Sequence, residues 1–119
     1  MTTLDALVVA LGAAVGAPAR YLVNHVVRER LGGTPVAGTL VVNVVGSFVL
    51  GLSVAAGLTG SWLGLVGTGF CGALTTFSTF ALEVWEAWVD EERRHAVANV
   101  ALSLGLGVLA AWAGWALAG

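Results

Sequence analysis

The sequence predicts an all-α integral membrane protein with four transmembrane helices. Of the 119 residues, 58% are hydrophobic and 10% are charged, whereas an ordinary globular domain carries about 25% charged residues. Residues 31–82 contain no Asp, Glu, Lys, Arg or His, and a membrane-spanning helix needs about 20 apolar residues. This stretch is therefore long enough to cross a bilayer twice, and four spans with short turns account for a single membrane domain over residues 1–119.

The first span is expected at residues 4–27. The apolar run at residues 6–15 could belong to a cleaved signal peptide, but such a peptide begins with basic residues. The residues before this run include Asp5 and no Lys or Arg, so we expect the segment to be retained as part of the first helix. Charged residues at 28–30 and the helix-breaking sequence GGTP at 32–35 then form a turn. The second span follows at residues 36–58.

The third span is expected at residues 62–88, after a short turn. Trp62, Trp85 and Trp88 mark its two ends, because tryptophan rings favour the membrane interface. As one straight helix the segment would measure about 40 Å, against a hydrocarbon thickness of about 30 Å. Glycines and adjacent threonines at 69–80 are poor helix formers, so we expect this span to be broken near mid-membrane.

The fourth span is expected at residues 96–117, after a charged connection. Small residues in the spans, such as Gly12 and Gly16, allow close helix packing in lipid. Because four thin helices offer little interior in which to place polar groups, we expect the chain to form an oligomer. The single cysteine, Cys71, cannot form an intrachain disulfide and is interpreted as a small buried hydrophobic residue.

This organisation excludes several functional classes. Four spans leave no soluble catalytic domain, no nucleotide-binding module and no basic surface for nucleic acid. The sequence offers no nucleophile paired with a base, and His25 and His95 lie at span ends, where solvated histidines are expected. The chain is therefore predicted not to be an enzyme.

Polar residues inside the spans are the candidates for function, since polar groups in hydrocarbon are costly. Asn43 stands out, because its amide has no local partner and needs another helix, a water molecule or a substrate. A single Ser or Thr is more often explained by a hydrogen bond to its own helix. In the third span, carbonyl groups freed at a break suit a cation, and Phe77 and Phe80 project from one face of its second half.

Three stretches of the chain resemble the signature sequences of one family. They are residues 16–21 (GAPARY), 38–48 (GTLVVNVVGSF) and 67–80 (GTGFCGALTTFSTF), the last followed by Glu83. In order and over the whole chain, they are similar to the CrcB/Fluc fluoride channels. The resemblance implies a dual-topology dimer of antiparallel protomers in the cell membrane, with two fluoride-selective pores that export cytoplasmic fluoride passively and so protect the cell from fluoride toxicity.

The resemblance also implies roles for individual residues. The pore would combine aromatic ring edges, an amide donor, hydroxyl groups and an acid, namely Phe77, Phe80, Asn43, Ser78, Thr79, Ser103 and Glu83. Arg20 would be the cation of the vestibule, and backbone carbonyls of Gly72 and Thr75, duplicated in the partner chain, would hold a structural sodium ion at the dimer centre. Hydroxyl and amide donors suit fluoride, because they replace its hydration without a full positive charge that would hold the ion too tightly.

One position departs from the family pattern. The family often carries a second hydroxyl one helical turn after the serine matched by Ser103, and this chain has Gly107 there. The resemblance to the family's polar track is therefore less complete in the fourth span, where Ser103 alone matches it.

Two other functional classes fit the sequence less well than a channel. A small proton-coupled multidrug transporter, the principal alternative, also has four spans but needs a carboxylate in its first span, where this chain has Arg20 and no interior acid. A membrane assembly subunit without transport activity would show no ordered line of polar residues. The asparagine and hydroxyl groups of the second to fourth spans argue against it.

The basic residues are unevenly distributed between the two ends of the helices. All of them lie on or near the side of the first and third connections, namely Arg20, Arg28, Arg30, Arg93 and Arg94. Because basic residues favour the cytoplasmic side, we expect a preferred orientation with both termini outside. The antiparallel partner is then either a second copy of the chain or an oppositely oriented homologue.

Overall fold

The computed structural model describes residues 2–119, and these residues fold almost entirely as helix. The segments are α1 (Thr3–Glu29), α2 (Pro35–Ala55), α3 (Gly60–Leu63), the π-helix η1 (Gly64–Cys71), α4 (Gly72–Leu74), α5 (Phe77–Val89) and α6 (Arg93–Ala118). Four stretches are long and apolar enough to cross a membrane, namely Thr3–Glu29, Pro35–Ala55, Gly60–Val89 and Arg93–Ala118. The predicted all-α class with four membrane-spanning helices is therefore confirmed for the described residues.

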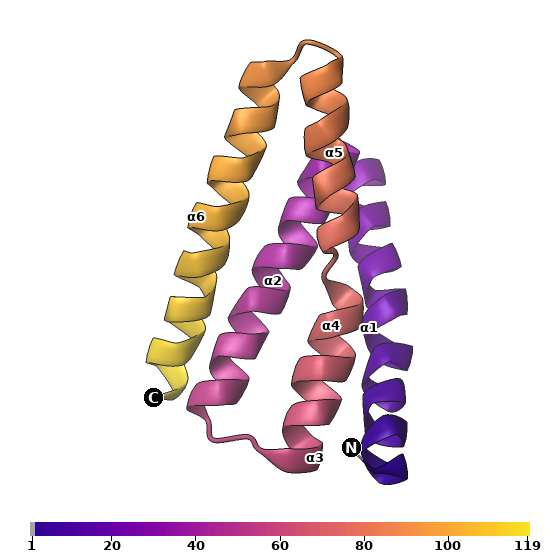
Figure 1. The fold of residues 1–119 in the computed structure, drawn as a ribbon, viewed down its shortest axis with the longest axis vertical. Coiled ribbons are helices and arrows are strands. Elements are labelled where there is room, and N and C mark those ends of the chain that lie inside the picture. Colours follow the sequence, from indigo (N-terminus) through magenta and orange to yellow (C-terminus); the bar gives the residue numbers. More distant parts are fainter. Residues whose placement is uncertain (1) are drawn as a thin grey trace.

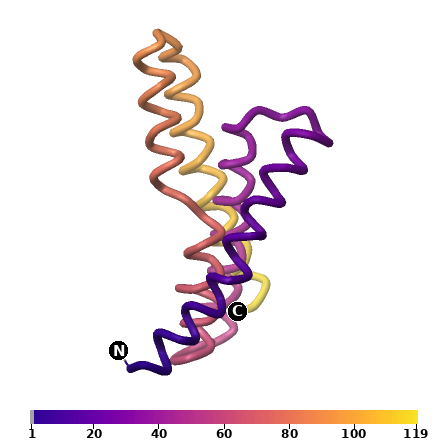
Figure 2. The backbone as a smooth tube through the Cα atoms, turned by 90° about the vertical axis from the view of Figure 1, so that its right-hand side faces the viewer, coloured from indigo at the N-terminus to yellow at the C-terminus, as the bar shows by residue number. Residues whose placement is uncertain are grey.

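The helices form an elongated bundle with extents of 46 × 28 × 28 Å. Both chain ends and the turn between α2 and α3 lie at one end of the bundle, and the other two connections lie at the opposite end (Figure 1). At that opposite end the hairpin of α5 and α6 diverges from the hairpin of α1 and α2 (Figure 2). We call it the splayed end.

The first two long helices begin at side-chain caps. Thr2 and Asp5 form a reciprocal capping box, in which the Asp5 N–H donates to Thr2 Oγ1 at 3.2 Å and the Thr2 N–H donates to Asp5 Oδ2 at 2.9 Å. Thr34 caps α2 by accepting from the Ala37 N–H, and Pro35 follows in the first turn. These caps satisfy N–H groups that have no partner within a helix.

Backbone contacts rather than large side chains hold the helices together. A Cβ atom added at Gly12 would overlap the Leu65 carbonyl oxygen of η1, and one added at Gly16 would overlap the Phe70 carbonyl oxygen. Between α2 and α6, a Cβ atom at Gly114 would overlap the Phe48 carbonyl oxygen in the same way. Most large apolar side chains instead face outward, as expected where lipid is the solvent and small residues form the helix contacts.

The chain leaves helical geometry between α4 and α5. Thr75 has φ −83° and ψ 162°, and Thr76 has φ −150° and ψ 119°, both extended conformations. The Thr76 side chain then caps α5 by accepting from the Thr79 N–H at 3.2 Å. The third long apolar stretch therefore consists of two helical parts joined by two extended residues.

We expect Gly12→Ala to lower the free energy of unfolding by about 1–3 kcal/mol, because the added methyl group overlaps the backbone of η1. Thermal unfolding in detergent measures this effect. Gly105→Ala is the matched control, since a Cβ atom there meets no described atom within 4 Å and alanine favours a helix over glycine. Equal melting temperatures for the two variants would contradict the close packing of α1 on η1.

Candidate functional site

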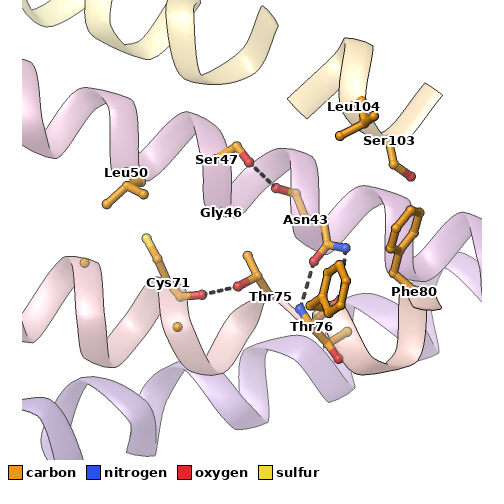
Figure 3. A pocket seen from close by; sticks show the side chains of 13 residues that line it. Asn43, Gly46, Ser47, Leu50, Cys71, Thr75, Thr76, Phe80, Ser103 and Leu104 are labelled. Carbon is orange, nitrogen blue, oxygen red and sulfur yellow. Dashed lines mark hydrogen bonds between the residues drawn. The ribbon is translucent and has the colours of Figure 1, made fainter. Parts of the chain in front are cut away.

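A cavity of about 400 Å³ lies beside the extended residues Thr75 and Thr76. We call it the central cavity. Its polar and aromatic lining comes from α2, from the segment around the two threonines and from α6 (Figure 3), and consists of Asn43, Ser47, Cys71, Thr75, Thr76, Phe77, Phe80 and Ser103. The structure therefore brings together four of the residues singled out as pore-lining, since Asn43, Phe77, Phe80 and Ser103 share this one cavity.

The Asn43 amide pairs with the backbone of Thr76. Its Nδ2 donates to the Thr76 carbonyl oxygen at 3.2 Å, and its Oδ1 accepts from the Thr76 N–H at 2.8 Å (Figure 3). An asparagine amide carries two N–H bonds, and only one of them is used within residues 2–119. Asn43 thus satisfies the backbone of Thr76, which has left the helix, and keeps one N–H available at the central cavity.

Several carbonyl groups lose their helical partners at the same place, and those of Gly72 and Thr75 are two of them. In a continuous α-helix the Gly72 carbonyl would accept from the Thr76 N–H, but that N–H donates to Asn43. The Thr75 carbonyl would accept from the Thr79 N–H, but that N–H donates to Thr76 Oγ1. The side chains of Asn43 and Thr76 thereby release the carbonyls of Gly72 and Thr75 for other partners.

The two phenylalanines lie on the first turn of α5. Their ring centroids are 6.1 Å apart and the ring planes are tilted by 51°. Phe80 is half-buried, whereas Phe77 is 79% exposed. Phe77 therefore lines the central cavity and at the same time stands on the open face of the chain.

The hydroxyl groups fall into two sets. Those of Ser78 and Thr79 lie near Thr76 Oγ1, at 3.4 Å and 3.1 Å respectively, and neither residue lines the central cavity. Ser103, on α6, donates to Asn99 Oδ1 at 3.0 Å. The structure thus separates Ser78 and Thr79 from the cavity that Ser103 shares with Asn43.

Sequence reasoning assigned no role to Ser47, which also lines the central cavity. Its hydroxyl donates to the Asn43 carbonyl oxygen at 2.8 Å. A Cβ atom added at Gly107 would lie 3.8 Å from Ser47 Oγ. The Ser47 hydroxyl on α2 therefore lies close to Gly107, the position on α6 where the family often has a hydroxyl. This proximity follows from the packing of α2 against α6 and cannot be read from the sequence.

Glu83 lies further toward the splayed end and lines two other cavities. The first, of about 200 Å³, we call the Arg28 cavity, and it is lined by Tyr21, Asn24, Arg28, Pro35, Thr39, Thr79 and Glu83. The second, of about 510 Å³, we call the His95 cavity, and its polar lining is Thr34, Glu83, Glu92, His95 and Asn99. Glu83 Oε2 accepts from the buried Thr39 hydroxyl at 3.0 Å, which ties α5 to α2.

Arg20 occupies a different place from the other candidates. It is half-buried on α1 and lines none of the three cavities just described. Within residues 2–119 no group of three or more His, Cys, Asp or Glu side chains is arranged to hold a metal ion.

Comparisons with known proteins give a consistent match. A family model described as "CrcB-like protein, Camphor Resistance (CrcB)" matches residues 7–115. A protein of Nocardia farcinica named fluoride-specific ion channel FluC 1 is 46% identical over 105 residues, which cover 88% of this chain and 74% of the relative. A relative from Symbiobacterium thermophilum (FluC 1) is 43% identical over 93% of this chain and 94% of its own length. A relative from Vibrio vulnificus (FluC) is also 43% identical, over 92% of this chain and 90% of its own length.

We expect Asn43→Leu to lower the free energy of unfolding by about 1–2 kcal/mol, because it leaves the Thr76 N–H and carbonyl without partners. Thermal unfolding in detergent reports the change. In the control Ser47→Ala, the lost hydroxyl bonded only to a carbonyl of its own helix, so a loss below about 0.5 kcal/mol is expected. If both variants lose the same stability, the amide pair does not hold the extended segment.

Proposed function

Because the chain belongs to the CrcB-like family, we propose that it is a fluoride-selective channel, and not an enzyme, which lets cytoplasmic fluoride leave the cell passively. Four membrane-spanning helices make it a multi-pass membrane protein, and the cell membrane is the place where such export protects against fluoride toxicity. The observation that carries the proposal is the central cavity, where one free N–H of Asn43 lies beside two phenylalanines.

The lining of the central cavity suits a small anion. It contains neutral donors and aromatic rings but no Lys or Arg side chain. An amide N–H and hydroxyl groups can replace water around the ion, and the edge of an aromatic ring is electropositive. An ion can therefore be partly dehydrated here without being bound so tightly that it fails to leave.

We propose that the ion path runs from this cavity toward the splayed end. The hydroxyls of Ser78 and Thr79 stand one helical turn before Glu83 on α5, and Ser103 contributes from α6. Arg20 is proposed as the vestibule cation that attracts the anion. These assignments rest on the family motifs together with the order of the residues along α5.

The proposed structural sodium ion fits the chemistry of the break. The carbonyls of Gly72 and Thr75 have lost their helical N–H partners to Asn43 and Thr76, and freed carbonyls at the end of a half-helix suit a monovalent cation. A bound sodium ion would supply positive charge that fixes these carbonyls, jointly with those of a second chain.

An antiparallel dimer is proposed as the functional unit. Phe77 lines the central cavity yet is 79% exposed, so a second chain is needed to enclose the cavity on that side. The partner is a second copy of the chain or a homologue inserted in the opposite orientation. The alternative of a proton-coupled multidrug transporter is disfavoured, because Asp5, the acid at the start of α1, is engaged in capping that helix.

Purified protein in liposomes loaded with fluoride is expected to release the ion, as measured with a fluoride-selective electrode. Phe80→Ile keeps an apolar side chain but removes the ring edge, so we expect the efflux rate to fall by at least about tenfold, equivalent to about 1.4 kcal/mol at the barrier. The fold should survive, since such apolar exchanges usually cost less than about 1.5 kcal/mol. Efflux equal to that of the wild type would remove Phe80 from the ion path.

The distribution of arginines predicts that both termini lie outside. Single cysteines at Leu31→Cys and Thr59→Cys, each in a Cys71→Ser background, report on the two ends of the bundle when intact cells are treated with an impermeant thiol reagent. We expect the cysteine at 59 to be labelled in clear excess over the one at 31. Equal labelling, together with efflux from the lone chain, would instead establish a homodimer that inserts in both orientations.

A further inference from the structure

Two hydrogen-bond acceptors in the Arg28 cavity lack a donor. Asn24 Oδ1 and Glu83 Oε1 are both inaccessible to solvent, and neither has a hydrogen-bond partner among residues 2–119. Both residues line the same cavity, Asn24 from α1 and Glu83 from α5. Buried polar atoms of this kind normally find a partner, because an unmade hydrogen bond costs its full desolvation free energy.

Five residues of the cavity wall carry donors. The Thr39 hydroxyl already donates to Glu83 Oε2, and the Asn24 amide NH₂ can serve Glu83 Oε1 but not its own Oδ1. Tyr21 and Thr79 each offer one neutral O–H, which can serve a single acceptor. Arg28 offers five N–H donors in a planar fork and a permanent positive charge. Only the arginine can therefore satisfy both acceptors at once and also balance the charge of a carboxylate.

The position of Arg28 allows this contact. It follows Asn24 by four residues on α1 and so lies on the same helix face. Its side chain is 54% exposed, and its recorded ion pair is a 4.0 Å approach of Nε to the adjacent Glu29, a solvated pair of little strength. Arg28 is thus part of the cavity wall, and its guanidinium is only weakly held by Glu29.

We propose that the Arg28 guanidinium closes over the Arg28 cavity and binds Glu83 Oε1 and Asn24 Oδ1, linking α1 to α5 at the splayed end. Arg28 is the one Arg or Lys among the described residues that line the two cavities joined by Glu83. On the other side of Glu83, His95 faces Glu92 at 3.5 Å. The positive charge opposite Glu83 therefore comes from Arg28.

This contact bears on conduction and, in that respect, rests on the proposed function. Glu83 follows Thr79 by one helical turn, so an uncompensated carboxylate there repels an anion moving along α5. With Arg28 closed, the pair is neutral and the repulsion is removed. Arg28 is thus a positioning residue that acts on the anion through Glu83.

A double-mutant cycle tests the pairing. The variants are Arg28→Gln, Glu83→Gln and the double variant that carries both changes. Arg30→Gln is the matched control, because Arg30 is exposed and lines none of the three cavities. Each is measured for fluoride efflux from liposomes and for its melting temperature in detergent. The decisive quantity is the effect of Arg28→Gln in each Glu83 background.

We expect Arg28→Gln to slow efflux about tenfold when Glu83 is present and less than about twofold when Glu83 is replaced. Its melting temperature should fall only in the Glu83 background, and Arg30→Gln should change neither measurement appreciably. An equal effect of Arg28→Gln in both backgrounds overturns the pairing. If the wild type itself releases no fluoride, the proposed function fails, and the melting temperatures of the same four proteins still decide whether Arg28 binds Glu83.

Discussion

The pairing of the Asn43 amide with the backbone of Thr76 is the interaction on which the rest of the site depends. Extended residues inside a membrane-spanning segment expose an N–H and a carbonyl that lipid cannot satisfy, and Asn43 satisfies both from α2. The same bond takes the Thr76 N–H away from the Gly72 carbonyl. One side chain therefore stabilises the interruption, frees a carbonyl and retains a further N–H in a residue that lines the same cavity as Phe77 and Phe80.

Close helix contacts at glycine residues also hold the segment around Thr75 and Thr76 in place. Gly12 and Gly16 bring α1 onto the backbone of η1, so the half of the third apolar stretch that precedes the extended residues is held by backbone contacts. Gly46 does the equivalent on α2, where an added Cβ atom would overlap the Thr75 side chain. Small residues thus fix the distance between α2 and the threonines that the Asn43 amide must span.

Much of the architecture follows from the sequence, because a long stretch without charge can only be accommodated in a membrane. The need of Asn43 for a partner outside its own helix was also predictable. Its partner Thr76 was not, since that pairing depends on two extended residues and on the packing of α2 against them. The placement of Ser47 opposite Gly107 was not predictable for the same reason, because hydropathy and spacing along one helix carry no information about a neighbouring helix. Nothing in the sequence indicated the π-helix η1.

At the splayed end, Glu83 has a structural role that is separate from the one proposed for it in the anion pathway. Glu83 accepts a hydrogen bond from the buried hydroxyl of Thr39. This contact joins α5 to α2, which belong to the two hairpins that diverge at the splayed end (Figure 2). A neutral residue would keep less of that attachment, because hydrogen bonds to a charged group are the stronger ones. The negative charge then has to be balanced within reach of its free oxygen, and Arg28 is the cation that shares its cavity. Structural attachment and the proposed passage of an anion thus place opposite demands on Glu83, and the proposed contact with Arg28 on α1 reconciles them.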